Sequence, residues 1–94
     1  MPVVGLLTLE IYLPDAASLK DRRQVVRSLK DRLRRRFNVS VAETDFQSSL
    51  RRAEISVAAV GPRPADVEQT LRRIEEEAAE TLGRALESSS IEIR

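Results

Sequence analysis

Basic side chains recur at helical spacing between Ser18 and Phe37, and arginine and lysine arranged in this way bind anions. The segment holds nine basic residues against two acidic ones, Asp21 and Asp31. At roughly 100° per residue, one flank of the predicted helix carries five of the basic residues: Lys20, Arg23, Arg27, Lys30 and Arg34. Neighbouring charges on this basic flank lie about 5–6 Å apart, and a polyanion would relieve their repulsion. The pattern predicts a phosphate-binding surface. The alternative is a charged, solvated face that only keeps the helix soluble.

Three carboxylates on two neighbouring predicted strands form a second candidate cluster. Glu43 and Asp45 are two residues apart, which places them on one side of a strand, and Glu54 lies on the next strand. Paired carboxylates can hold Mg²⁺ or divide the roles of general acid and general base. Such clusters are more often salt-bridged, and we expect these carboxylates to pair with Arg51 and Arg52.

The composition excludes much enzyme chemistry. The chain has no cysteine and no histidine, so thiolate nucleophiles, disulfides and the commonest general base and metal ligand are absent. Its three glycines match no phosphate-binding loop. We therefore expect a protein that is not an enzyme and that uses no catalytic residue, metal ion or cofactor.

The apolar N-terminal run from Met1 to Pro14 bears on location. It is too short to span a membrane, is interrupted by Glu10 and lacks the basic start of a signal peptide. We therefore expect a cytoplasmic protein with no membrane partner.

Hydrophobic periodicity predicts six elements in a chain of 94 residues. Strands are predicted at 3–13, 39–46, 53–60 and 90–94, and helices at 18–37 and 64–82. Ser18 and Asp21 have the spacing of a capping box at the first helix. The apolar stripe of that helix contains Leu19, Val26, Leu29, Leu33 and Phe37, of which Leu29 and Leu33 should be fully buried.

The order of these elements, βαββαβ, predicts an α+β fold. Right-handed crossovers and a central hairpin give a ferredoxin-like sandwich, in which a four-stranded antiparallel sheet of order 4-1-3-2 carries both helices on one face. We expect residues 1–94 to form this single domain.

The sheet face that the helices leave open is a rival functional surface. Five apolar residues are predicted to share it: Val4, Leu6, Ala42, Ala58 and Val60. A contiguous apolar patch on a small domain usually marks an interface, so a homodimer or other protein-interaction module without a nucleic-acid role is the alternative function. Only Tyr12 offers an aromatic ring on this face, so RNA would bind the basic flank together with Arg51 and Arg52 rather than stack across the sheet.

The stretch SLKDRRQVVRSLKDRLRRRFNVSVAETDFQSSLRRAEISVAAV, residues 18–60, resembles the YlxP-like family of small bacterial proteins, a domain of unknown function. The resemblance implies a ferredoxin-like fold. Because family members are often encoded beside translation-initiation and ribosome-maturation factors, it also implies a role near the ribosome. We therefore expect ribosomal or other RNA as the partner of the basic flank.

Overall fold

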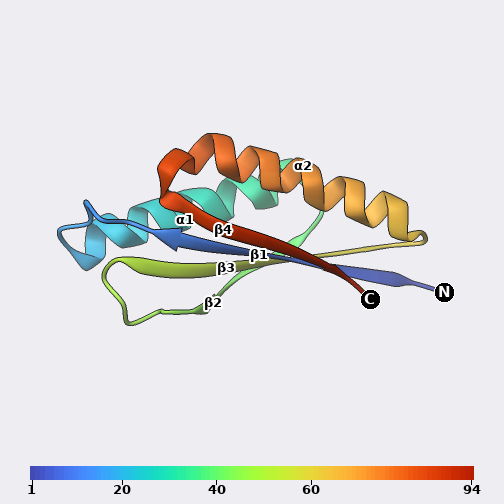
Figure 1. Ribbon diagram of the computed structural model, residues 1–94, viewed down its shortest axis with the longest axis horizontal. Helices are drawn as coiled ribbons and strands as arrows, with labels where there is room; N and C mark the ends of the chain where they lie inside the picture. Colours follow the sequence, from blue (N-terminus) through green and yellow to red (C-terminus); the bar gives the residue numbers. More distant parts are fainter.

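The computed structural model describes residues 1–94 as two layers, a four-stranded antiparallel sheet and two helices that cover one of its faces (Figure 1). The elements in chain order are β1 (Val3–Tyr12), α1 (Leu19–Arg36), β2 (Ser40–Asp45), β3 (Arg52–Gly61), α2 (Pro64–Leu82), the short 3-10 helix η1 (Gly83–Ala85) and β4 (Leu86–Ile93). The sheet order is β2-β3-β1-β4, which is the predicted order read from the other edge. The predicted ferredoxin-like fold is confirmed.

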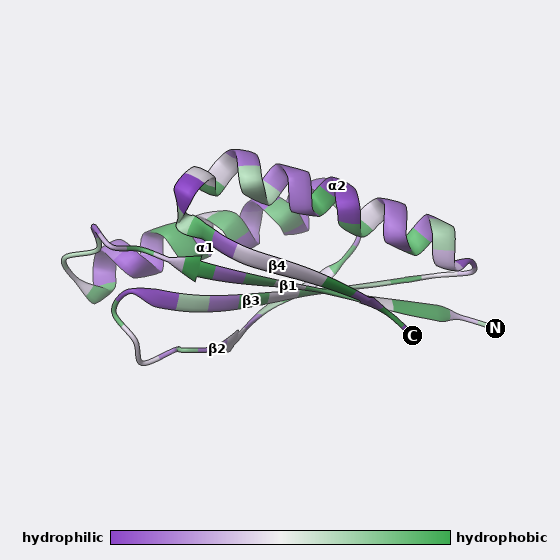
Figure 2. Ribbon diagram, viewed as in Figure 1, coloured by the Kyte–Doolittle hydropathy of each residue, from purple (hydrophilic) through white to green (hydrophobic).

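The core lies between the sheet and the helices because the central strands alternate. Leu7, Leu9 and Ile11 of β1 are buried beside Ile55 and Val57 of β3, with the polar residues between them on the open face. Figure 2 shows apolar and polar residues alternating along both helices. Four residues of α2 complete the core at helical spacing: Val67, Leu71, Ile74 and Ala78.

Helix α1 begins at the predicted capping box. The Ser18 hydroxyl accepts a hydrogen bond from the backbone N–H of Asp21 at 3.2 Å, and the Asp21 carboxylate accepts one from the N–H of Ala17 at 3.1 Å. Leu29 and Leu33 are fully buried, as predicted. Leu19 was wrongly placed in the apolar stripe: it is 54% exposed, and Arg22 occupies the first core-facing position.

Helix α2 packs closely on β1 because residue 5 is glycine. A Cβ atom on Gly5 would lie 2.5 Å from Val67 Cγ1 and 2.7 Å from Leu71 Cδ1. At the other end of α2, Gly83 adopts a φ of 56°, which side-chain-bearing residues rarely adopt, and ends the helix.

Strand β4 differs most from the sequence-based prediction. It begins at Leu86 rather than Ser90, after the unpredicted η1. Its segment from Glu87 to Ser90 is exposed, so no apolar alternation marks it in the sequence, and backbone pairing with β1 alone makes it an edge strand. The chain termini meet in this part of the sheet, where Val4 and Arg94 exchange two backbone hydrogen bonds.

Candidate functional site: the basic flank and the open sheet face

The basic residues of α1 divide into two groups by their partners. Arg22 is buried and forms a salt bridge with Glu43 of β2. Arg32 and Arg36 both bind Oε1 of Glu77 on α2, at 2.7 and 2.6 Å. The hydrogen bond from Arg32, with the charges of Arg36 and Arg32, holds the pKa of Glu77 below its ordinary value although partial burial opposes the shift. These three arginines therefore make contacts between α1 and other elements and are not free to bind an external anion.

The basic flank is the group that remains largely free. No carboxylate lies within 4.0 Å of the charged groups of four of its members, Lys20, Arg23, Arg27 and Lys30. Lys30 is half-buried and the other three are exposed. The flank lies on the side of α1 that faces away from Glu77 and α2, so no acidic residue of α2 neutralises it.

Arg34, the fifth member of the flank, also contacts groups of the protein itself. Its Nη2 atom donates a hydrogen bond of 2.7 Å to the carbonyl oxygen of Val41, and its Nη1 atom lies 3.9 Å from Asp31. Gln47 donates to the carbonyl of Glu43, two residues further along the same edge of β2. Side-chain donors on an edge strand discourage the addition of a foreign strand.

Arg51 and Arg52 lie where the β2–β3 hairpin enters β3. Arg51 donates to the carbonyl of Pro14 at 3.3 Å, and the guanidinium of Arg52 stacks over the ring of Phe46 at 4.6 Å. Neither side chain forms a salt bridge with Glu43, Asp45 or Glu54, so the predicted pairing was wrong. The hairpin bulges between Glu43 and Asp45, which changes the direction of the side chains.

The three carboxylates do not form one cluster. Glu43 points toward the helices and forms a salt bridge with Arg22, whereas Glu54 lies on the open face and accepts a hydrogen bond of 2.7 Å from the Thr44 hydroxyl. The Asp45 carboxylate accepts a hydrogen bond from the backbone N–H of Phe46. No group of three or more potential metal ligands is formed. Glu43 is paired with Ile55, whose side chain is buried beneath the helices, whereas Glu54 is the residue before Ile55 on β3 and therefore points to the opposite face.

The open sheet face carries an apolar patch at one end. Val4 and Val60 are cross-strand partners and are 46% and 72% exposed, and Leu6 faces Ala58 in the next pair on that face. Ala42 of β2 faces Ser56 and adjoins Ala58 diagonally. The structure therefore brings all five predicted interface residues together.

Toward the other end, the open face becomes polar. Thr44 bonds with Glu54 and Ser56, and Ser88 donates to Glu10. Tyr12 is the aromatic residue of β1 on this face and is 44% exposed. Neither helix of the protein is long and apolar enough to cross a membrane.

Sequence comparison places the chain in a family. Residues 4–91 match the model of a family described as a protein of unknown function, DUF503. The chain belongs to this family. It is also 32% identical over 72 residues to the uncharacterized protein YlxP of Bacillus subtilis (strain 168), which covers 77% of this chain and 78% of YlxP. The resemblance noted from residues 18–60 is thereby confirmed and extends over most of the chain.

Two solved structures share the fold of this DUF503 protein. A dimeric protein of unknown function with a ferredoxin-like fold from Bacteroides fragilis NCTC 9343 aligns with a TM-score of 0.61 at 16% identity, over 98% of this chain and 94% of that one. A dimeric ferredoxin-like protein from Thermobifida fusca YX, also of unknown function, aligns at 0.50 and 11% identity, over 97% and 90%. At these identities the similarity establishes the fold alone.

Sequence reasoning missed the role of Arg22. The residue lies four positions before Val26 and seven before Leu29, both buried. That spacing already placed Arg22 on the core side of α1, where a charge requires a partner.

Proposed function

We propose that this DUF503 protein is a non-enzymatic RNA-binding protein that holds the phosphate backbone of ribosomal or other RNA on the basic flank of α1. The supporting observation is the division of charges along this helix. Arg22, Arg32 and Arg36 all have carboxylate partners, whereas four adjacent residues of one flank have none. Unpaired charges of one sign on one side of a helix attract a polyanion.

The geometry of the flank favours contacts with phosphates over contacts with bases. Residues 20–34 span about 21 Å of helix axis at 1.5 Å per residue, enough to follow several successive phosphates. Arg34 ties this flank to the edge of β2, so the sheet stands beside the flank and hinders insertion of α1 into a groove. Phosphate contacts fix position and carry little sequence information. We therefore expect binding with weak sequence preference.

The salt dependence of RNA binding tests this function. Each phosphate neutralised contributes a slope of about −0.7 on single strands and −0.9 on duplexes to log affinity against log salt. Four or five contacts therefore predict about −3 to −3.5 with single-stranded RNA. The double variant Arg27→Glu/Lys30→Glu removes two contacts, so the slope with single-stranded RNA should become shallower by about 1.4. The same variant should co-sediment more weakly with ribosomal subunits.

The matched control reverses two arginines on the other helix. Arg72→Glu/Arg73→Glu changes the net charge by the same amount, yet α2 surrounds these positions with acidic residues, and Arg72 already pairs with Glu68 and Glu75. This variant should bind with nearly the parental slope. If Arg27→Glu/Lys30→Glu binds ribosomal RNA as tightly as the parent and with the same slope, the basic flank is a hydrated face and the proposal is wrong.

A homodimer assembled through the open sheet face is the second candidate function. It is supported by the exposed pair Val4 and Val60, and the two neighbours of similar fold are described as dimers. Sedimentation equilibrium at high micromolar concentration should then give twice the chain mass, and Val60→Lys should give a folded monomer. A parent protein that is monomeric at that concentration would exclude a stable dimer. Thr8→Lys places the same charge at the polar centre of the face. A dimer that persists in Thr8→Lys but is lost in Val60→Lys is assembled through the apolar patch rather than through the whole face.

A further inference from the structure

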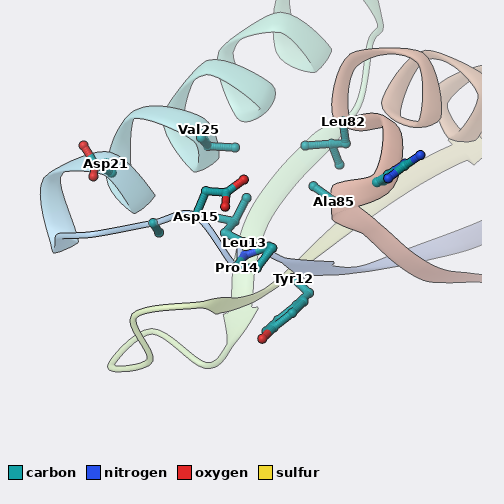
Figure 3. Close-up of a pocket in the computed structure, with 10 residues that line it drawn as sticks. Tyr12, Leu13, Pro14, Asp15, Asp21, Val25, Leu82 and Ala85 are labelled. Atoms are coloured by element: carbon teal, nitrogen blue, oxygen red, sulfur yellow. The ribbon is translucent and has the colours of Figure 1, made fainter.

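A hollow at the hairpin end of the open face contains an unusual combination of side chains. It has a volume of about 270 Å³ and is lined by Tyr12, Arg52, Arg84 and Glu87, from β1, β3, η1 and β4. Tyr12 and Arg84 also line a larger cleft of about 550 Å³ between the start of α1 and the end of α2. Figure 3 shows the apolar side chains of Leu13, Val25, Leu82 and Ala85 in this neighbouring cleft.

Both guanidinium groups of the hollow lack a carboxylate partner. Neither Arg52 nor Arg84 takes part in a salt bridge, although Glu87 lines the same hollow. Arg52 is held in place by its stacking on Phe46, and its backbone carbonyl accepts two hydrogen bonds from Arg22. Arg84 follows Gly83, whose positive φ turns the chain out of α2. Two unpaired guanidiniums, of which Arg52 is held by its stacking, suit an oxyanion because their N–H forks match phosphate oxygens.

The aromatic ring of Tyr12 stands beside these charges. Tyr12 and Arg52 are direct cross-strand partners on the open face, so their Cβ atoms are about 5 Å apart. Nearly half of the Tyr12 side chain is exposed. An exposed ring next to arginines is the arrangement on which proteins stack a nucleic-acid base.

Three acidic residues lie in or near the hollow and oppose the charge of its two arginines. Glu10 accepts a hydrogen bond from Ser88, and Glu54 accepts one from Thr44. Glu87 is the one acid that lines the hollow itself. Among the residues that line the hollow, two arginines stand against this one glutamate, so an anion in contact with the lining meets a net positive charge.

We propose that this hollow binds one nucleotide unit, with its base stacked on Tyr12 and its phosphate held by Arg52 and Arg84. The unit is either a free mononucleotide or a nucleotide of a single RNA strand, since both present a planar base and a phosphate. The site uses none of the five residues of the basic flank and goes beyond the function proposed above.

The sequence makes this site easy to observe, because Tyr12 is the only tyrosine of the chain and there is no tryptophan. The Tyr12 ring-proton signals of the parent protein, distinguished from those of Phe37 and Phe46, therefore report on the hollow. Titration with uridine monophosphate should shift the Tyr12 ring signals upfield, as stacking does. Uridine and inorganic phosphate, added separately, should each bind at least tenfold more weakly. An oligouridylate that binds more tightly than uridine monophosphate identifies a strand as the ligand, and equal affinity per site identifies the free nucleotide.

Variants with opposite expected effects give the sharpest test. Arg52→Gln and Arg84→Gln should each weaken uridine monophosphate binding about tenfold, whereas Glu87→Gln should strengthen it by removing the opposing charge. Arg73→Gln is the matched control, because Arg73 also stacks on a phenylalanine, Phe37, at 5.9 Å but lies on α2. It should leave the affinity unchanged.

The proposal is overturned if uridine monophosphate at millimolar concentration leaves the Tyr12 ring signals in place, or if inorganic phosphate binds equally well. Weaker binding by Glu87→Gln would also contradict it. Repeating the titration with Arg27→Glu/Lys30→Glu separates the two sites. Nucleotide binding should persist in that variant even where binding of long RNA is lost.

Discussion

The Nη2 atom of Arg22 lies 2.5 Å from the Oε1 atom of Glu43, and this buried salt bridge joins the start of α1 to the edge strand β2. The same guanidinium donates to the carbonyl oxygens of Phe46 and Arg52, at 2.8 and 2.9 Å. One side chain thus ties α1 to both strands of the β2–β3 hairpin.

Arg22→Met should destabilise the protein by about 3–5 kcal/mol, because it leaves a largely buried carboxylate and two backbone carbonyls without a donor. Urea unfolding at neutral pH measures this change. The double variant Arg22→Met/Glu43→Leu should recover part of the loss, since no unpaired charge remains. Arg23→Met, one position along on the exposed flank, is the control and should change stability by less than about 0.5 kcal/mol.

Gly5→Ala should cost about 1–3 kcal/mol, the usual range for overpacking. The new Cβ atom would overlap the side chains of Val67 and Leu71 and push α2 away from β1. Gly61→Ala is the matched comparison, because the Cβ atom there meets only Val67, at 3.0 Å. Equal midpoints of thermal unfolding for the two variants would contradict the close approach of α2 at Gly5.

Leu33→Ala should cost about 2–5 kcal/mol through lost burial and the cavity that remains. Leu33 lies at the centre of α1's core-facing side and is fully buried. Leu19→Ala removes the same atoms from an exposed position of the same helix. A loss for Leu33→Ala as small as that for Leu19→Ala would mean that the core side of α1 is wrongly assigned.

The stability difference between the parent and Glu77→Gln should depend on pH. The pKa of Glu77 is lower in the folded protein than its ordinary value of 4.5, chiefly through the hydrogen bond from Arg32. A lowered pKa means that the ionised carboxylate stabilises the fold above about pH 4.5 and that this contribution disappears as the pH falls through the folded-state value. The difference should therefore be largest near neutral pH and shrink in acid. Glu76→Gln, at a residue without an ion pair, should show no such trend.

Much of the architecture could be predicted because its signals are local. The alternation of Leu7, Leu9 and Ile11, the capping pair Ser18 and Asp21, and the helix stop at Gly83 each involve residues close in sequence. Helix and strand periods place such residues on one face before any tertiary contact forms. Strand β4 was shortened in the prediction because an exposed edge strand needs no apolar alternation.

What the sequence determined by itself is the order of the elements, the core side of each central strand and the unequal distribution of charge along α1. Only the tertiary structure decided which charges are neutralised. Arg22 pairs with Glu43, and Arg32 and Arg36 pair with Glu77. Ion pairing requires atoms within about 4 Å, and the packing of the two helices and the hairpin brings these residues, distant in sequence, to that distance. The same packing left Lys20, Arg23, Arg27 and Lys30 unpaired, and it gathered Tyr12, Arg52 and Arg84 from three separate elements around one hollow.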